Sequence, residues 1–218
     1  MKRLLILLCE ALFCISLYGC SATSDEQIAS FESLSYKERA KQLQSLNNLE
    51  ELGRVAIIPL KKGAHSLPSV NVTYRYKKSS FAIEFTGPMG LQYAKIEVYQ
   101  NGTTYLNLMG ENYKGDNARQ LLIDEFNLDI PIMDLPAIMI GTPRGKLTFD
   151  EKGYVTKAQF NGYTVNYKDY KFYRGGIPLP KGIEILWPHK TCIQIFMAAY
   201  RYSYQWLAGI KGKGKMNR

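Results

Sequence analysis

Apolar and polar side chains alternate repeatedly along the middle of this chain, and few folds accommodate such a pattern. Successive side chains of a β-strand point to opposite faces, so each alternating segment predicts a strand with one apolar face. Turn residues separate the segments, and Asn101-Gly102 is typical of a tight hairpin. The pattern therefore predicts an antiparallel meander whose strands share one apolar face. The apolar positions of its segments are Val55 and Ile57; Val70, Val72, Tyr74 and Tyr76; Phe81, Ile83 and Phe85; and Ala94, Ile96 and Val98.

Helix-like segments flank this meander, and further strands follow it. Leu43 and Leu46 share one face of a predicted helix over residues 35–49. Two short helices are predicted over residues 117–126 and 131–141, and proline and glycine mark the ends of the second. The later strands are predicted at Lys146–Phe149, Thr156–Phe160, Thr164–Lys168, Ile183–Trp187 and Cys192–Ala198. We expect a mainly β fold with a few helices, in which a curved antiparallel sheet closes around its apolar face and the helices cover the open side.

Residues 1–19 have the layout of a lipoprotein signal peptide. Lys2 and Arg3 precede an apolar run that is too short for a convincing transmembrane helix, which needs about 20 apolar residues. The run ends in Leu-Tyr-Gly-Cys at residues 17–20, which resembles the lipobox read by lipoprotein signal peptidase. We expect cleavage before Cys20 and an N-acyl diglyceride on that cysteine. The alternative is an ordinary signal peptide with a cysteine nearby.

Ser21 follows the predicted lipidated cysteine. Aspartate at this place retains lipoproteins in the inner membrane of enteric bacteria, so Ser21 favours the periplasmic face of the outer membrane. Residues 20–34 are expected to hold the lipidated cysteine and a tether, residues 35–200 a single domain, and residues 201–218 a tail of aromatic and basic residues. Such a tail suits anionic headgroups, and solvated disorder after Trp206 is the alternative.

Charge and cysteine content restrict the possible partners. Cleavage would remove Lys2, Arg3 and Glu10 and lower the net charge from +9 to +8. A basic exported protein suits an anionic lipid surface, and we expect no nucleic-acid partner. Cys192 would be the one cysteine left without lipid, so no disulfide is expected within the chain. Its strand-like surroundings predict a buried, inert thiol.

The residues do not predict a catalytic or metal site. His65 and His189 lie in loop-like settings and are expected at the surface. The motifs of serine hydrolases, zinc proteases and dithiol enzymes do not occur, and Gly145-Lys146 lacks the partners that a phosphate loop requires. We therefore expect no enzyme, no metal and no cofactor apart from the lipid on Cys20.

Five short motifs follow the lipobox in an order that resembles the LolB family of outer-membrane lipoprotein receptors. They are GRVA at residues 53–56, FAIEFTGPMG at 81–90, LDIPIMDLPAIMIG at 128–141, GYTVNY at 162–167 and LPKGIEI at 179–185. The resemblance covers about residues 46–199. Two features depart from the family: Ile138 stands where the family often has tryptophan, and the tail after residue 200 has no counterpart.

The resemblance implies a half-open barrel of about 10–11 strands with a lid of about three short helices, like that of the periplasmic carrier LolA. It implies a monomer that accepts lipoproteins from a LolA-type carrier and places them in the outer membrane, in contact with its lipids. In the family, an exposed apolar residue in the loop after the third strand serves membrane insertion. The matching loop is Gly87, Pro88, Met89 and Gly90, with Met89 at the tip. The alternative is that Met89 folds back onto the sheet.

The inward-facing side chains of the predicted strands and lid supply a surface on which acyl chains could bind. The resemblance implies a hollow barrel with an acyl-chain cavity, whereas the residues themselves leave a filled core equally open. The candidate cavity residues are Val55, Ile57, Val72, Tyr74, Phe81, Ile83, Phe85, Ile96, Val98, Leu135 and Ile138.

Three kinds of function are compatible with these observations. The leading hypothesis is a non-enzymatic protein that binds and transfers lipid-modified cargo. The second is a structural or assembly lipoprotein that binds proteins with a similar sheet, and the third is a hydrolase on an unfamiliar scaffold. A continuous apolar cavity beneath the helices would favour the first hypothesis over the second.

Overall fold

The strands form one antiparallel sheet in the computed structural model, which describes residues 25–59, 69–126, 128–173, 176–187 and 191–203. Across this described part, the order of the eleven strands is β6-β5-β4-β3-β2-β1-β11-β10-β9-β8-β7. Their bounds are β1 Asn48–Pro59, β2 Val70–Lys77, β3 Ser80–Thr86, β4 Gln92–Tyr99, β5 Thr104–Leu108, β6 Glu111–Gly115, β7 Lys146–Phe149, β8 Val155–Phe160, β9 Tyr163–Tyr173, β10 Ile177–Trp187 and β11 Thr191–Ser203.

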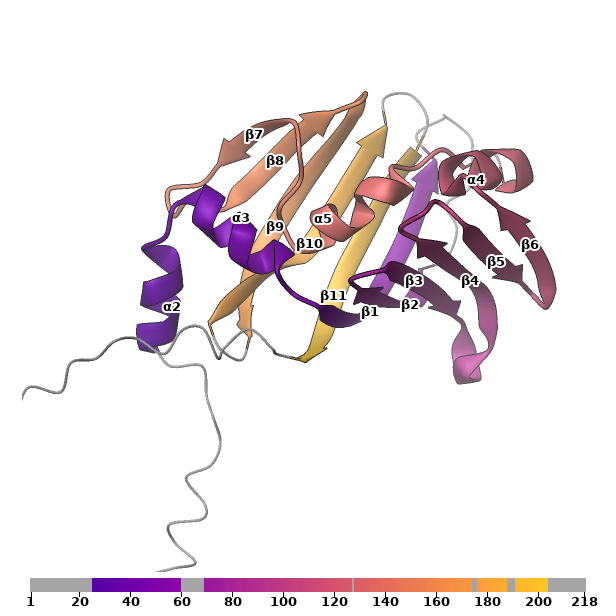
Figure 1. Ribbon diagram of the computed structural model, residues 1–218, viewed down its shortest axis with the longest axis horizontal. Coiled ribbons are helices and arrows are strands. Elements are labelled where there is room, and N and C mark those ends of the chain that lie inside the picture. Colours follow the sequence, from indigo (N-terminus) through magenta and orange to yellow (C-terminus); the bar gives the residue numbers. More distant parts are fainter. Residues whose placement is uncertain (1–24, 60–68, 127, 174–175, 188–190, 204–218) are drawn as a thin grey trace, which may run out of the picture.

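Strands β1 and β11 join two meanders into this single sheet (Figure 1). Val55 of β1 lies opposite Ile195 of β11, so apolar residues of both meanders meet on one face. The pairing shifts by one residue between Leu52 and Gly53. A side chain at Gly53 would collide with the backbone of Phe196, so glycine is required at this irregularity in the pairing.

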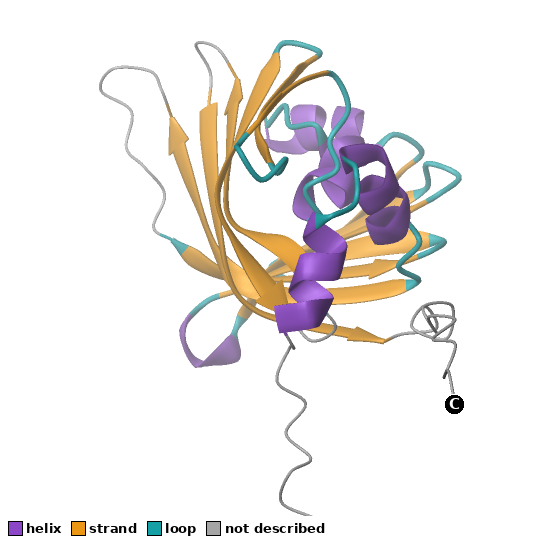
Figure 2. Cartoon of the chain, turned by 90° about the vertical axis from the view of Figure 1, so that its left-hand side faces the viewer, coloured by secondary structure: helices purple, strands orange, loops and turns teal. Residues whose placement is uncertain are grey.

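Helices cover the concave side of the curved sheet (Figure 2). They are α2 Asp25–Glu32 and α3 Tyr36–Gln44 before β1, and α4 Ala118–Phe126, η3 Ile132–Asp134 and α5 Leu135–Met139 between β6 and β7. A further single turn, η2 Pro88–Gly90, lies in the loop between β3 and β4 and has no buried residue. A capping box opens α3, because the Ser35 side chain accepts the Glu38 amide and the Glu38 carboxylate accepts the Ser35 amide. No helix in the described ranges is long and apolar enough to cross a membrane.

The two faces of the sheet differ in polarity. Val72, Tyr74 and other alternate residues of the strands are buried on the concave face, beneath the helices. On the opposite face, Arg75 bridges strands β1, β2 and β3, with its Nε 2.9 Å from a Glu50 carboxylate oxygen and its Nη1 2.8 Å from one of Glu84. This polarity directs the apolar surface of the sheet toward the helices.

The structure confirms the predicted fold class, a mainly β chain with a strongly curved antiparallel sheet and a few short helices. The helix predicted over residues 35–49 is too long, because α3 ends at Gln44 and β1 begins at Asn48. Two neighbouring strands, β2 and β11, pair with this first part of β1 and override its helical pattern. Strand β6 was not predicted, because its residues ENYKG are polar and lie at an edge of the sheet.

Two further segments differ from expectation. Strand β10 begins at Ile177, six residues before the predicted start, although it contains Pro178 and Pro180. Residues 177–180 pair with β9 alone, and β11 joins β10 from Gly182 onward, so the prolines lie at an edge where a missing N–H is tolerated. The predicted tether over residues 20–34 contains the helix α2 in its described part.

Candidate functional site

A small apolar cavity of about 70 Å³ lies between the sheet and the chain segment 128–139. Its floor is built where the two meanders meet, from β1, β2 and β3 on one side and β10 and β11 on the other. The surface of its lining is entirely apolar. The lining residues are Val55, Ile57, Val72, Tyr74, Ile83, Phe85, Leu128, Ile130, Pro131, Ile132, Leu135, Met139, Ile185, Ile193, Ile195 and Met197.

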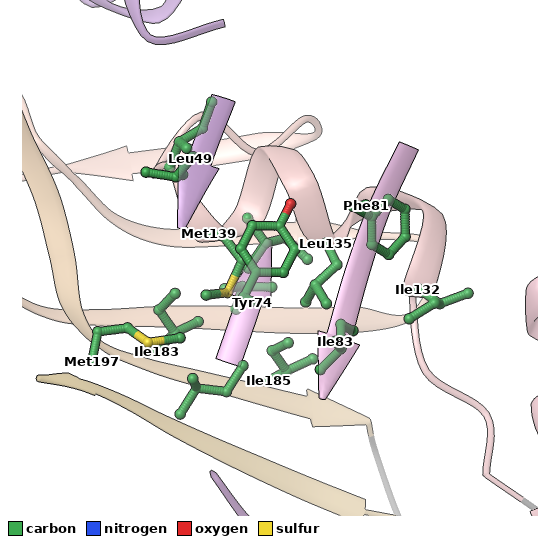
Figure 3. Packing of buried hydrophobic residues seen from close by; sticks show 14 of the residues in the cluster. Leu49, Tyr74, Phe81, Ile83, Ile132, Leu135, Met139, Ile183, Ile185 and Met197 are labelled. Carbon is green, nitrogen blue, oxygen red and sulfur yellow. The ribbon is translucent and has the colours of Figure 1, made fainter. Parts of the chain in front are cut away.

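Segment 128–139, with η3 and α5, forms the roof of this cavity. Ile132 and Met139 are almost completely buried, and Leu135 is also buried. Figure 3 shows Leu135 and Met139 beside the ring of Tyr74, which rises from β2 toward the roof. The roof therefore fills most of the space that the curved sheet encloses.

Proline and glycine determine where the roof begins and ends. Pro131 is the N-cap of η3, and Pro136 lies in the first turn of α5, where its missing N–H has no helical partner to lose. Gly141 follows α5 with a φ of 72°, a left-handed conformation that suits glycine and ends the helix. These are the residues whose spacing predicted this segment.

Hydrogen bonds fasten the roof to β9. Asp129 pairs with the Arg119 guanidinium of α4 at 2.6 and 2.8 Å, and the Tyr163 hydroxyl donates to Asp129 at 2.9 Å. The Tyr167 hydroxyl donates to the Ile138 carbonyl oxygen at 3.1 Å. Burial and the hydrogen bond to Asp129 raise the pKa of Tyr163 to about 12, so this phenol stays protonated and continues to donate. Toward β2 and β3, by contrast, the roof presents apolar side chains.

A buried carboxyl group lies next to the cavity. Glu51 of β1 has no exposed surface, and neither of its carboxylate oxygens has a hydrogen-bond partner in the structure. It stands opposite Tyr74 of β2, whose buried hydroxyl likewise has none. Burial raises the pKa of Glu51 well above its ordinary value, because an apolar environment disfavours the charged form.

The structure places the eleven candidate cavity residues in two groups. Seven line the cavity: Val55, Ile57, Val72, Tyr74, Ile83, Phe85 and Leu135. The other four, Phe81, Ile96, Val98 and Ile138, are buried in the core but do not line it. Phe81 and Val98 instead line a second, more open pocket with Met133 and Pro136 of the roof.

The opposite wall of the cavity was missed by sequence reasoning. Ile193, Ile195 and Met197 of β11 and Ile185 of β10 complete the floor. Their alternation was visible in the predicted strands over residues 183–187 and 192–198. The long-range pairing of β1 with β11, which brings them to this cavity, had no local signal.

The loop between β3 and β4 projects into solvent. Met89 is 96% exposed and does not fold back onto the sheet. Its φ of 58° is left-handed, an unusual conformation for a residue with a side chain. The Gly87 amide donates to the Leu91 carbonyl oxygen at 2.8 Å, and the Tyr93 ring occupies the space that a side chain at Gly87 would fill. The loop is thus held closed at its base while its apolar tip is free.

Several predicted features lie outside the described residues, among them Cys20, His65, His189 and the tail from residue 204 onward. Cys192 is described, and it is buried, with burial raising the pKa of its thiol. Within the described ranges, no group of His, Cys, Asp and Glu side chains is arranged to hold a metal ion.

A family model described as "Outer membrane lipoprotein LolB" matches residues 49–199 of this chain. The chain belongs to the LolB family. The match confirms the resemblance drawn from the five motifs, which covered nearly the same residues. It agrees with the lipobox in making the chain an outer-membrane lipoprotein of this family.

Individual relatives support the LolB assignment at low identity. An outer-membrane lipoprotein LolB of Francisella tularensis is 24% identical over 188 residues, covering 84% of this chain and 88% of the relative. One from Photorhabdus laumondii is 28% identical over 174 residues, covering 77% and 80%. A solved putative outer membrane lipoprotein-sorting protein domain from Vibrio parahaemolyticus has a TM-score of 0.51 at 9% identity, over 78% of this chain and 91% of that domain, and therefore shares the fold.

Proposed function

We propose that this protein accepts lipoproteins from a LolA-type periplasmic carrier, holds their acyl chains beneath the roof, and inserts them into the outer membrane. Cys20 would carry the lipid that anchors the protein on the periplasmic face of that membrane. The observation that carries the proposal is the apolar cavity between the sheet and a roof whose contacts with β2 and β3 are apolar. It favours lipid binding over a role confined to binding proteins.

The energetics of acyl chains require direct transfer between proteins. Each buried CH₂ is worth about 0.8 kcal/mol, so one chain of about sixteen carbons is worth about 12 kcal/mol. Release into water between carrier and membrane would be far too slow. Because the chain has no recognisable nucleotide-binding motif, transfer must run downhill, and this cavity must hold acyl chains less tightly than a bilayer does.

The cavity as it stands cannot hold an acyl chain. A cavity of about 150 Å³ holds a benzene ring, and the present one measures about 70 Å³. The roof must therefore move before an acyl chain can bind. Since the hydrogen bonds described above attach the roof to β9, we propose that it separates from β2 and β3 and that acyl chains pass between them.

Weakening the hydrogen bonds of Asp129 tests whether they hold the roof in place. Asp129→Asn keeps the size of the side chain but removes the charge that pairs with Arg119. We expect amide hydrogen exchange over residues 129–141 to accelerate by about tenfold, because a charge-assisted hydrogen bond exceeds a neutral one by about 1.4 kcal/mol. Asp134→Asn is the matched control, since Asp134 pairs with the exposed Arg144 and not with the sheet. Equal exchange in both variants would contradict the fastening role.

The proposed function is tested by transfer in vitro. A purified complex of a LolA-type carrier with a radiolabelled lipoprotein is mixed with this protein lacking the lipidated cysteine, and the two proteins are then separated. We expect the label to move to this protein, and to move on to liposomes when these are added. Retention of all label on a carrier that is competent for transfer to another LolB would exclude the proposal.

A further inference from the structure

A second apolar loop lies beside the Met89 loop. The hairpin between β5 and β6 carries Met109, which is 77% exposed. The Met109 amide donates to the Tyr93 carbonyl oxygen at 2.9 Å, so the hairpin is bonded to the strand that leaves the Met89 loop. Leu91, at the end of that loop, is 59% exposed. Three large apolar side chains therefore project from one end of the sheet.

The backbone conformation of the β5–β6 turn does not favour methionine at position 109. Met109 and Gly110 connect the paired residues Leu108 and Glu111, and both have positive φ, 47° and 96°. A two-residue hairpin of this kind favours Asn-Gly, because asparagine tolerates the left-handed conformation. Methionine at the first position strains the backbone and exposes an apolar side chain.

The same chain contains the ordinary version of this turn. Asn161 and Gly162 connect the paired residues Phe160 and Tyr163, with φ values of 47° and 81°. The two hairpins have the same length and matching positive φ angles, yet one carries asparagine and the other methionine. The geometry of the turn therefore does not explain why residue 109 is a methionine.

Hydrogen-bonded polar side chains lie next to these apolar residues. The Gln92 amide donates to Asn107 at 3.3 Å, and Asn107 donates to Asn112 at 2.9 Å. Glu111, the acidic residue next to Gly110, accepts the Tyr113 hydroxyl at 2.8 Å. Apolar tips above a band of hydrogen-bonding side chains match the change from acyl chains to headgroups at a bilayer surface.

We propose that the β5–β6 hairpin is a second membrane-contacting element, and that Met109, Leu91 and Met89 enter the lipid bilayer together as one apolar surface. The inference rests on the proposed function, which gives the Met89 loop its membrane role. The occupant is a bilayer rather than a protein because the side chains protrude from loop tips instead of lining a groove, and because a lipoprotein of this family is anchored at a membrane. Two contacts fix the orientation of the sheet relative to the membrane, which one loop cannot do.

Depth-dependent quenching tests the proposal in the lipid-anchored mature protein. Single Met109→Cys, Met89→Cys and Ser79→Cys variants are labelled with an environment-sensitive fluorophore and reconstituted into liposomes that contain brominated phospholipids. Ser79 is an exposed residue in the turn between β2 and β3, at the other end of the sheet, and serves as the control. Protein without a substitution controls for labelling of Cys192. We expect similar quenching at 109 and 89 and none at 79.

The outcomes separate this inference from the proposed function. Quenching at 89 without quenching at 109 would refute the second contact and leave the first intact. No quenching at either position would refute the membrane role of both loops. A signal at 109 that responds to the carrier protein and not to brominated lipid would show that this hairpin docks a protein, which also overturns the inference.

A substitution that suits the backbone provides an independent readout. Met109→Asn restores the ordinary turn, so we expect the urea midpoint of unfolding to rise while the rate of lipoprotein insertion falls by about tenfold. Met109→Leu should retain the insertion rate. An insertion rate unchanged in Met109→Asn would show that the hairpin does not contribute.

Discussion

We expect Met89→Glu to slow the insertion of lipoproteins into liposomes severely while leaving their acceptance from the carrier intact. Met89 is 96% exposed at the end of a loop, so the substitution does not disturb the core or the cavity. It removes about 2 kcal/mol of apolar burial in the bilayer and adds a charge whose insertion costs about 2.5 kcal/mol or more. The combined loss corresponds to a decrease in the insertion rate of about a thousandfold.

Two measurements separate acceptance from insertion in the Met89→Glu protein. Acceptance is measured as label transferred from the carrier to protein that lacks the lipidated cysteine, and insertion as label that resists extraction from liposomes at high pH. Met89→Leu is the matched control, because leucine retains an apolar side chain of similar size in the same backbone conformation. If Met89→Glu inserted cargo as fast as the parent protein, the loop would have no role in the membrane step.

Replacing Glu51 with leucine stabilises the protein by about 2 to 4 kcal/mol at neutral pH, because it removes a buried carboxyl group without a hydrogen-bond partner. The effect depends on pH in a defined direction. The pKa of Glu51 in the folded protein lies well above the ordinary value of 4.5, so as pH rises the unfolded chain releases this proton first. The parent protein therefore loses stability as pH rises from 4.5 toward the folded-state pKa.

Urea unfolding at pH 4 and pH 8 checks this prediction. We expect the difference in unfolding free energy between Glu51→Leu and the parent to be small at the lower pH and to grow at the higher one. Glu50→Gln is the control, because Glu50 is partly exposed and paired with Arg75 on the outer face of the same strand. A stability difference that is the same at both pH values would show that Glu51 is not the group responsible.

Local patterns were sufficient to find the cavity residues on β2 and β3, but not those on β10 and β11. The alternation through Val72, Tyr74 and Ile83 was sufficient to place these residues on the concave face, where they line the cavity. Ile193 and Ile195 alternate just as clearly, but they reach the cavity through pairing of β1 with β11, strands separated by more than 130 residues. Register between distant strands depends on the whole sheet, and a single sequence holds no local signal of it.

Other errors have local causes. Glu51 follows the helix predicted over residues 35–49 and precedes the alternation that begins at Val55, so no pattern predicted its burial beside Tyr74. The strand predicted from residue 183 omitted the segment with Pro178 and Pro180, and only the folded sheet shows that β11 does not pair there, so that prolines are tolerated. The exposure of Met89 was expected from the family resemblance, whereas Met109 belongs to none of the motifs that carried it.

The chemistry of sulfur at the two loop tips links this protein to the redox state of its surroundings. Thioethers as exposed as those of Met89 and Met109 are oxidised by peroxide to sulfoxides, which are polar and chiral. Oxidation would thus replace an apolar side chain with a group that prefers water, at the surface that we propose enters the bilayer. A methionine sulfoxide reductase could reverse the damage. Leucine at the same positions would serve the bilayer equally well without this sensitivity, so the proposed delivery of lipoproteins would be sensitive to oxidative stress through these two methionines.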